Sequence, residues 1–186
     1  LVALLTVNGT LVVSIALLLC GAIMFTGLSI YDAYHKTKDG VHNFATKLHE
    51  DSIIPTRGTN ESAGYDLYAY LDSDKIEIKP GETKMVNIGI SLEIPSGYFA
   101  GIFARSGIAS KRNLRPANCT GVIDSDYRGE IKVPIYNDSS MVQVIENKER
   151  VAQMIILPYL SVTFNEVDNL SESNRSDSGF GSTGNK

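Results

Sequence analysis

The sequence lacks tryptophan altogether, and its 186 residues include only two cysteines and three histidines. Cys20 lies in a long apolar segment and Cys119 in a distant polar one, a placement that matches neither a disulfide framework nor a zinc site. His35, His42 and His49 all fall within the first 50 residues. The rest of the chain therefore has no histidine to act as the base of a Ser-His or Cys-His nucleophile, or as a ligand for zinc.

Long basic runs are also missing, and the formal net charge is −4 at pH 7. Non-specific binding to nucleic acid depends on clustered lysine and arginine, so the sequence does not indicate a nucleic-acid partner. Because histidine is absent as well, any chemistry beyond residue 50 must use carboxylates, hydroxyls, arginine, backbone amides or a cation bound by oxygen.

Charge is absent from residues 1–31, which contain a continuous apolar run over 11–30. That run has the length that spans the core of a bilayer, roughly 20 residues, so we expect a single transmembrane helix over residues 1–31. A buried helix is the alternative. Lysines follow only on the C-terminal side, at Lys36 and Lys38. This favours a membrane-anchored protein with its main domain on the cytoplasmic side, or a cytoplasmic protein if the segment is no true anchor.

Residues 32–52 are polar and mixed in composition. Val41, Phe44, Ala45 and Leu48 recur at helical spacing, so we expect a polar linker that contains a short amphipathic helix. Such a linker is long enough to separate an anchor from a folded domain.

Short β-prone runs fill residues 53–167 and are separated by turn signals such as PGE, PSG and YRG. Many short strands at regular spacing, without helical patterns between them, predict an all-β domain of the β-barrel, jelly-roll or sandwich type. Residues 168–186 lose all apolar periodicity, so we expect a flexible C-terminal tail there.

The stretch GVIDSDYRGE, residues 121–130, places two aspartates directly after a strand-like run. We expect residues 124–129 to connect the two strands of a β-hairpin, with the returning strand beginning at Glu130. In such a connection one aspartate can accept backbone hydrogen bonds, and the other can orient a water for attack. Taken alone, the stretch is more typical of a structural turn than of a catalytic one.

Three other stretches offer groups that bind ions. ARSGIAS (104–110) and GFGSTG (179–184) combine hydroxyl donors with glycine, which lets backbone amides approach an anion, and Arg105 or Arg175 adds a guanidinium. Asp66 interrupts an otherwise apolar strand and could hold a hydrated cation through water. Each of these features alone is typical of a turn, an edge residue or a flexible tail.

Five segments occur in a fixed order along the chain: AGYDLYA, ARSGIAS, NCTGVIDSDYRGE, ERVAQMII and R-x4-FGSTG. Together they resemble the five motifs of the trimeric dUTPase family, over roughly residues 53–186. The resemblance implies a jelly-roll-like β-barrel that forms a homotrimer, in which every active site draws on all three subunits. It also implies hydrolysis of dUTP to dUMP and pyrophosphate with Mg²⁺, and a C-terminal tail that closes over the substrate.

The third motif carries the catalytic and base-binding roles that the resemblance implies. Asp124 matches the carboxylate that activates the water for in-line attack on the α-phosphorus. Tyr127 matches the ring beneath the deoxyribose. Asn118, with the backbone near Gly121 and Ile123, matches the groups that bind the uracil edge. Asp126 matches no chemical role, and we expect it to hold the hairpin.

Phosphate and metal roles are implied for the first, second and fourth motifs. Arg105, Ser106 and Gly107 match phosphate contacts of the second motif, and Gln153 matches the phosphate contact of the fourth. Asp66 matches the aspartate that supports Mg²⁺ indirectly through its water shell. This fits the tendency of Mg²⁺ to keep several waters and few protein ligands.

The tail carries the remaining roles implied by the resemblance. Phe180 matches the aromatic side chain over the uracil ring. Further substrate contacts, mostly to the γ-phosphate, are implied for Arg175, Gly181, Ser182 and Thr183.

The sequence departs from the family pattern at several positions. The fifth motif usually reads Arg-Gly-x-Gly-Gly-Phe-Gly, but Ser176 and Ser178 replace two of these glycines and restrict the backbone where the tail must bend. Lys148 stands where glycine often precedes the fourth motif, and Ala104 stands where proline is common. The apolar N-terminal segment is not part of the pattern.

Two alternatives to a dUTPase remain open. A dCTP deaminase-type enzyme would share the fold, but it uses a glutamate near the base and a different third motif. A non-catalytic dUTPase-like module would bind nucleotide without turnover. The Asp-Ser-Asp-Tyr sequence of residues 124–127 favours the hydrolase over both.

Overall fold

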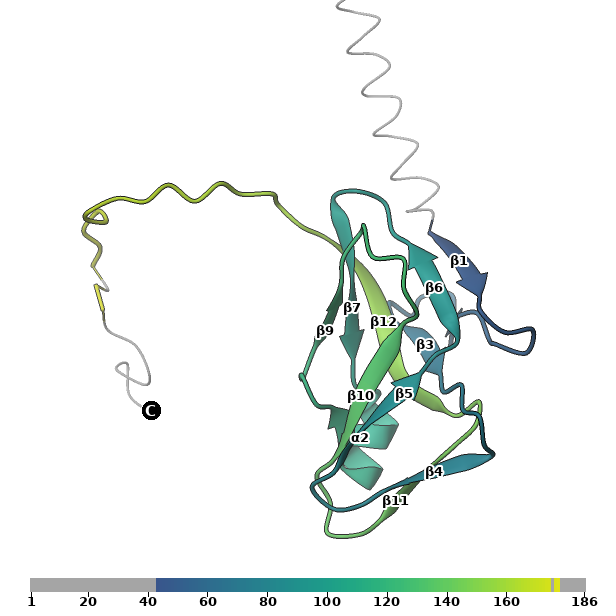
Figure 1. The fold of residues 1–186 in the computed structure, drawn as a ribbon. Helices are drawn as coiled ribbons and strands as arrows, with labels where there is room; N and C mark the ends of the chain where they lie inside the picture. The colour runs from purple at the N-terminus through teal and green to yellow at the C-terminus, as the bar shows by residue number, and fades with distance from the viewer. Residues whose placement is uncertain (1–42, 175, 178–186) are drawn as a thin grey trace, which may run out of the picture.

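The computed structural model describes residues 43–174 and residues 176 and 177. Within these ranges the chain forms twelve β-strands and one short helix (Figure 1). The bounds of these elements are β1 Phe44–Lys47, β2 Thr56–Arg57, β3 Tyr65–Tyr68, β4 Lys75–Ile78, β5 Thr83–Asn87, β6 Ile90–Glu93, β7 Tyr98–Phe103, α2 Ser106–Arg112, β8 Leu114–Pro116, β9 Gly121–Ile123, β10 Lys132–Asn137, β11 Gln143–Glu146 and β12 Arg150–Pro158.

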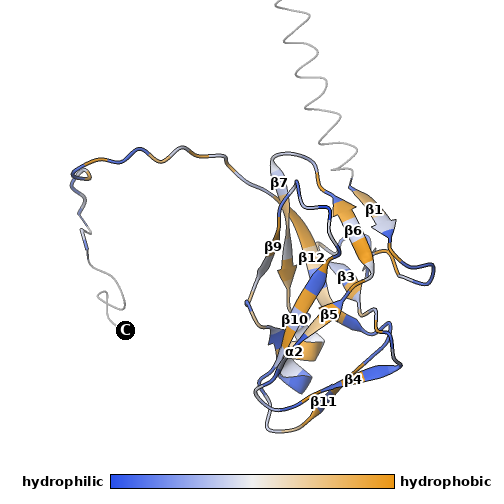
Figure 2. Ribbon diagram, in the orientation of Figure 1, coloured by the Kyte–Doolittle hydropathy of each residue, from blue (hydrophilic) through white to orange (hydrophobic). Residues whose placement is uncertain are grey.

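The strands of the described residues pair in four sheets, all of them antiparallel. The largest sheet has the order β2-β3-β12-β7-β9, and a second has the order β5-β10-β8. The pairs β1-β6 and β11-β4 form the other two. Figure 2 shows hydrophobic residues gathered on the central strands and hydrophilic residues in the outlying loops. The all-β class predicted from the sequence is confirmed.

Strand β10 illustrates why these residues form strands around a core. Val133, Ile135 and Asn137 alternate along it and are at most 1% exposed. Burying each of the two aliphatic side chains stabilises the fold by about 1.5–3 kcal/mol. The Asn137 amide is satisfied inside the core, because its Nδ2 donates to the carbonyls of Ile78 at 2.8 Å and Met141 at 2.7 Å.

The predicted hairpin around residues 124–129 is wrong. β9 pairs with β7 in one sheet, whereas β10 pairs with β5 and β8 in another, so the connection crosses between sheets. Ile131 explains the crossing. Its side chain is fully buried, its N–H donates to the Ile90 carbonyl at 2.9 Å, and its carbonyl accepts from the Ile88 N–H at 3.0 Å. These contacts draw the chain away from β9.

The short helix expected within residues 32–52 is also wrong in its described part. Phe44–Lys47 is strand β1, paired with β6, and the Leu48 N–H continues the contact by donating to the Gly89 carbonyl at 2.9 Å. All four side chains of β1 are exposed. Backbone hydrogen bonds to the neighbouring strand, rather than burial of an apolar helix face, therefore decide this structure.

The residues after β1 contact the rest of the fold through their side chains. The ring of His49 stacks on that of Tyr70, with centroids 4.0 Å apart, and Asp51 pairs with Lys148 at 2.9 Å. The Lys148 ammonium lowers the pKa of Asp51, and burial raises the pKa of Tyr70. β1 and the residues after it thus pack on the same fold, although they precede the domain boundary at residue 53 that we expected.

The transmembrane helix expected over residues 1–31 lies outside the described residues. Among those that are described, no helix is long and apolar enough to cross a membrane. At the other end β12 stops at Pro158, and residues 159–174 extend away from the barrel as an arm without strand or helix (Figure 1).

Candidate active site

The segment that carries Arg105 is a helix rather than the turn that its sequence suggests. β7 ends at Phe103, Arg105 is still extended with φ −80° and ψ 138°, and α2 begins at Ser106. Ser106 and Gly107 are exposed, and a Cβ at Gly107 would meet nothing within 4 Å. The first turn of α2 contains no acidic residue. It is therefore open on its outer side and free of negative charge.

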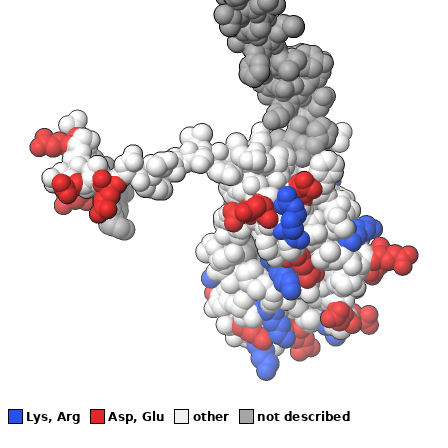
Figure 3. Space-filling view, turned by 45° about the horizontal axis from the view of Figure 1, so that its top comes forward, with Lys and Arg blue, Asp and Glu red and all other residues white. Residues whose placement is uncertain are grey.

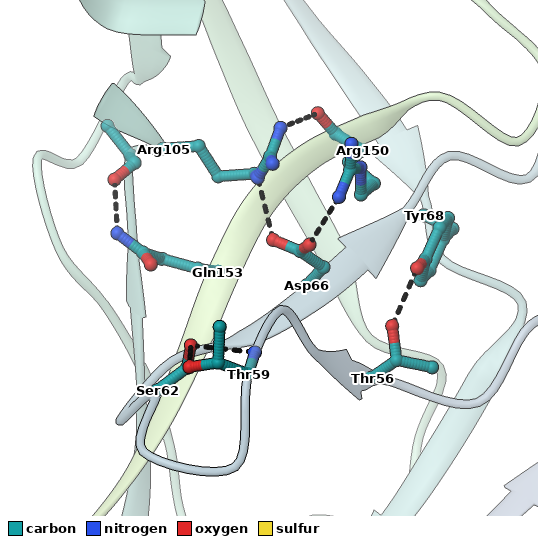
Figure 4. A network of polar contacts seen from close by, with 9 residues as sticks. Thr56, Thr59, Ser62, Asp66, Tyr68, Arg105, Arg150 and Gln153 are labelled. Atoms are coloured by element: carbon teal, nitrogen blue, oxygen red, sulfur yellow. Dashed lines mark hydrogen bonds and ion pairs between the residues drawn. The ribbon is translucent and has the colours of Figure 1, made fainter. Parts of the chain in front are cut away.

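A carboxylate joins Arg105 to another arginine (Figure 4). Oδ1 of Asp66 accepts from Arg105 Nε at 2.6 Å, and Oδ2 accepts from Arg150 Nη1 at 3.1 Å. Arg105 Nη1 also donates to the Arg150 carbonyl at 3.3 Å. The side chain of Asp66 is 12% exposed, so these pairs are better shielded from water than ordinary surface pairs. Two guanidiniums over one carboxylate leave the cluster with one net positive charge, which suits an anion.

Arg150 is a functional candidate that sequence reasoning missed. The available signal was its position at the start of the ERVAQMII motif, but Arg150 is itself exposed, so burial did not mark it. Its partner, Asp66, lies 84 positions away in sequence, so the pair could not be derived from local spacing. Both carboxylate oxygens of Asp66 already accept hydrogen bonds from guanidiniums. They leave Asp66 only the indirect metal role, through water, that the sequence predicts.

Gln153 lies beside this cluster, opposite Asp66 on β3 and Phe103 on β7. Its Nε2 donates to the Ala104 carbonyl at 2.9 Å, which fixes the peptide just before Arg105. A Cβ on Gly64 would lie 2.5 Å from Gln153 Oε1, so the glycine of the first motif leaves the space that this amide fills. Gln153 therefore holds the backbone that presents Arg105.

The residues predicted to bind the base and activate water lie around β9. A Cβ on Gly121 would come 3.1 Å from Ile102 Cβ and 3.5 Å from Asn118 Nδ2, so this turn packs closely on β7. Asp124 follows Ile123 and is exposed. It lines a surface hollow of about 580 Å³ together with Phe99, Val122, Ser125, Asp126 and Tyr159.

Short-range hydrogen bonds hold the loop that follows Asp124. The Tyr127 hydroxyl donates to the Glu130 carbonyl at 3.0 Å, and the Tyr127 N–H donates to the Asp124 carbonyl at 3.2 Å. Arg128 Nη1 donates to the Ser125 carbonyl at 2.6 Å. Tyr127 is 44% exposed, which leaves part of its ring free to contact a ligand.

Asp126 does not hold this loop as we expected. It is exposed, and its side chain makes no hydrogen bond or ion pair with any other described residue. Arg128 and Tyr127 supply the contacts instead, because their longer side chains reach the backbone carbonyls of Ser125 and Glu130. Gly129 permits the packing, since a Cβ there would lie 3.0 Å from Tyr127 Cε2 and closer still to the end of that ring.

The two groups of predicted site residues lie apart along β7. Ile123, next to Asp124, pairs with Ala100, whereas Arg105 lies beyond Phe103 at the end of the strand. Three strand residues span about 10 Å, and Arg105 and Asp124 extend the separation in opposite directions. A single chain therefore does not bring Asp124 to its own cluster of Asp66, Arg105 and Arg150.

The tail residues predicted to contact substrate, Arg175, Phe180, Gly181, Ser182 and Thr183, lie outside the described residues, as does Ser178. Ser176 is described and has φ 47°, a left-handed conformation that a glycine would adopt without strain. It stands at one of the positions where the sequence pattern led us to expect glycine.

The described residues contain no group of three or more histidine, cysteine, aspartate or glutamate side chains that could hold a metal ion. The carboxylate, hydroxyl and backbone oxygens near Arg105 are of the type that Mg²⁺ prefers.

Comparison with known proteins agrees with this fold and site. A family model described as dUTPase matches residues 50–184. The deoxyuridine 5'-triphosphate nucleotidohydrolase of Hydrogenobaculum sp. (strain Y04AAS1) is 46% identical over 140 residues, which cover 75% of this chain and 96% of the relative. That of Escherichia phage T5 is 43% identical over 145 residues, which cover 75% of this chain and 97% of the relative.

Solved structures give the same result. A mutant dUTPase of Staphylococcus bacteriophage 80alpha with dUpNHpp superposes with a TM-score of 0.70 at 26% identity, and the match covers 77% of this chain and 98% of that one. A mutant dUTPase from phage phi11 of S. aureus, whose structure reveals the coordination of a structural Mg(II) ion, has a TM-score of 0.61 at 22% identity. It covers 69% of this chain and 97% of its own, and at this identity it supports the fold alone. Given the family match over residues 50–184 and relatives above 40% identity, the chain belongs to the dUTPase family.

Proposed function

We propose that this chain hydrolyses dUTP to dUMP and pyrophosphate. The observation that carries the proposal is the cluster in which Asp66 aligns Arg105 and Arg150 with one net positive charge. It lies in the same molecule as an exposed carboxylate, Asp124, on a loop beside the Asn118 turn. The relatives from Hydrogenobaculum and phage T5 carry this activity in their names.

Asp124 orients a water for attack on the α-phosphorus and takes its proton, while pyrophosphate leaves in line. Tyr127 lies beneath the deoxyribose, where a 2′-hydroxyl would collide with the ring. Asn118 and the backbone near Gly121 and Ile123 bind the uracil edge, and cytosine is rejected because its hydrogen-bonding groups leave theirs unpaired.

The phosphates bind at the first turn of α2, through Arg105, Ser106 and Gly107. Gln153 acts mainly by fixing the backbone before Arg105, since its Nε2 donates to the Ala104 carbonyl. Mg²⁺, when bound, neutralises charge that develops on the phosphate oxygens. Asp66 would assist that ion only through water, because its own oxygens hold the two arginines.

We also propose a homotrimer in which the phosphate cluster of one chain and Asp124 of another complete each site. The separation of the two groups along β7 supports this. The arm after β12 supports it too, because alternate side chains, Leu160, Val162 and Phe164, are 63–92% exposed. That alternation suits a strand covered by a neighbouring chain. The tail from residue 168 would then close over a neighbouring site, with Phe180 over the base.

Complementation tests the shared site. An Asp124→Asn chain and an Arg105→Gln chain should each be inactive alone, and trimers assembled from both by joint refolding should regain a substantial part of the activity. Refolding each variant alone is the control. Mixed trimers that remain as inactive as either parent would contradict a site shared between chains.

A substrate comparison tests the reaction itself. The protein should release pyrophosphate from dUTP, with little turnover of dCTP, UTP or dTTP. Ammonia release from dCTP would instead support a deaminase of the same fold. Binding of a non-hydrolysable dUTP analogue without any turnover of dUTP would support a non-catalytic module.

The apolar segment over residues 11–30 supports a further proposal, that it anchors the enzyme to a membrane with the catalytic domain on the cytoplasmic side. Activity should then sediment with membranes when the full chain is expressed, and become soluble when residues 1–40 are deleted. Activity in the soluble fraction with the full chain intact would rule out the anchor.

A further inference from the structure

Helix α2 presents the phosphate-binding residues, yet it has little stability of its own. It has seven residues, no side-chain cap at its N-terminus, and a left-handed residue, Asn113, at its end. Isolated helices of this length are unstable in water, so contacts with the rest of the fold must hold it in place. Its N-terminal side is tied through Arg105 to Asp66 and to the Arg150 carbonyl.

Its C-terminal end is tied by Arg112. Arg112 Nε donates to Gln143 Oε1 at 3.2 Å, Nη1 pairs with Glu149 Oε1, and Nη2 donates to the Val144 carbonyl. All three guanidinium nitrogens thus have protein acceptors, and the Arg112 side chain is 28% exposed. The Arg112 guanidinium is therefore engaged by acceptors of the protein itself.

Glu149 completes the connection. Its Oε1 accepts a hydrogen bond from Arg112 Nη1. Its Oε2 accepts from the Glu146 N–H at 3.1 Å, which fixes the turn between β11 and β12. The next residue is Arg150, whose guanidinium binds Asp66 and whose carbonyl accepts from Arg105. The contacts form a closed ring that runs from one end of α2, through the β11–β12 turn and β3, to the other end.

We propose that Arg112 and Glu149 are positioning residues for phosphate binding: they hold α2 and the start of β12 in register, so that Arg105 meets the triphosphate correctly. The inference rests on the proposed dUTP hydrolysis and deepens it. Neither residue touches the substrate. Their loss acts on the phosphate side of the site and leaves Asp124, on a different loop, able to activate water.

The test is steady-state kinetics of Arg112→Gln and Glu149→Gln in the full chain. We expect KM for dUTP to rise about tenfold and kcat to fall less than about threefold, because binding is loosened while the base is intact. The double variant should cost little more than either single one, as for two residues that act as a unit. Arg112→Lys should restore part of the loss by keeping the charge near Glu149.

Asp51→Asn is the matched control. It removes an ion pair from the same β11–β12 turn, on the side of Lys148, without touching Arg112. Its KM should stay within about twofold of the unaltered protein. An equal rise in KM for Asp51→Asn would overturn the proposal, because any loosening of the turn would then have the same effect. An unchanged KM for Arg112→Gln would also overturn it, because Arg112 would then not be coupled to phosphate binding.

Hydrogen exchange separates this proposal from the function on which it rests. Amides of α2 should exchange faster in Arg112→Gln and Glu149→Gln than in Asp51→Asn, whether or not nucleotide is turned over. If the unaltered protein released no pyrophosphate from dUTP, the proposed function would fail, and the exchange rates would still decide the role of the ring. Unchanged exchange in α2 would refute that role.

Discussion

The cluster that we propose to bind phosphate, here called the phosphate-side cluster, and the Asp124 loop are built in opposite ways. Asp66, Arg105, Arg150 and Gln153 come from β3, β12 and the end of β7, and their contacts link positions 39 to 84 residues apart. The hydrogen bonds that hold the Asp124 loop, by contrast, link residues at most three positions apart. Its long-range ion pair, between Arg128 and Glu93 at 4.0 Å, joins two side chains that are more than half exposed.

The difference shows how each half of the site obtains its shape. The phosphate-side cluster is fixed by charges that the fold of a single chain brings together, so it is organised before substrate arrives. The Asp124 loop is exposed beside a surface hollow and depends on local bonds. Figure 3 shows one face of the molecule, on which basic and acidic side chains intermingle over the strands. The arm after β12 carries acidic side chains.

The largest effect should come from the exposed loop. Asp124→Asn should lower kcat about 10³-fold or more, because a general base contributes roughly that much, and nucleotide binding should survive. The unfolding temperature should barely change, since Asp124 makes no ion pair with any other described residue. Pyrophosphate release and calorimetric binding of a dUTP analogue would measure the two effects.

Asp126→Asn is its matched control, two positions away in the same loop. The Asp126 side chain makes no bond with the described residues, so kcat should change by less than about threefold. If Asp126→Asn lowered kcat as much as Asp124→Asn, the effect would come from the negative charge of the loop as a whole. Asp124 would then have no specific role as the base.

The second effect should combine activity and stability. Asp66→Asn leaves Arg105 and Arg150 without their shared charge, and should cost about 2 kcal/mol of unfolding free energy, below the range for fully buried pairs because both arginines are partly exposed. KM should rise by at least about tenfold. Urea unfolding and initial rates give the two numbers.

The control for stability is Lys84→Gln, which breaks a surface pair with Glu82 at 3.8 Å. It should cost less than about 0.5 kcal/mol. Equal losses in Asp66→Asn and Lys84→Gln would mean that the cluster is no more organised than the surface, and the contrast between the two halves would disappear.

A third, smaller effect should come from packing within the cluster. Gly64→Ala places a Cβ 2.5 Å from Gln153 Oε1 and must displace the amide that holds the Ala104 carbonyl. KM should rise about threefold to tenfold with kcat nearly unchanged. In a Gln153→Ala background the same substitution should have little effect, because the clash is gone. A full effect in that background would exclude Gln153 as the route.

Local patterns explain how much the sequence could predict. Alternation of apolar residues identifies strands such as β10, and turn signals separate them, so the all-β class follows from short-range sequence. The site residue types follow from motif order, which is also a property of the linear chain. Asp66, Arg105 and Gln153 each lie in one of those motifs, and the structure brings the three residues close together. The roles expected for them stay predictions.

Long-range contacts explain what the sequence could not predict. The pairing of β9 with β7 depends on Ile131 joining the other sheet, which no residue within 121–130 encodes. β1 has exposed side chains on both faces, so its strand arises from the edge of β6 alone. α2 is too short to show a period, and Arg150 is defined by a partner in β3.

The smallest effect should come from a single local bond in the Asp124 loop. Tyr127→Phe removes the hydrogen bond from the hydroxyl to the Glu130 carbonyl at 3.0 Å but keeps the ring. A neutral, exposed hydrogen bond contributes about 0.5–1.5 kcal/mol at most, so kcat/KM for dUTP should fall by no more than about threefold to tenfold. Tyr127→Ala should do much worse and should also raise the relative rate with UTP, because the ring that collides with a 2′-hydroxyl is gone. If Tyr127→Phe were as damaging as Asp66→Asn, the loop would depend on that one bond as strongly as the cluster depends on its shared charge, and both halves of the site would be organised in advance.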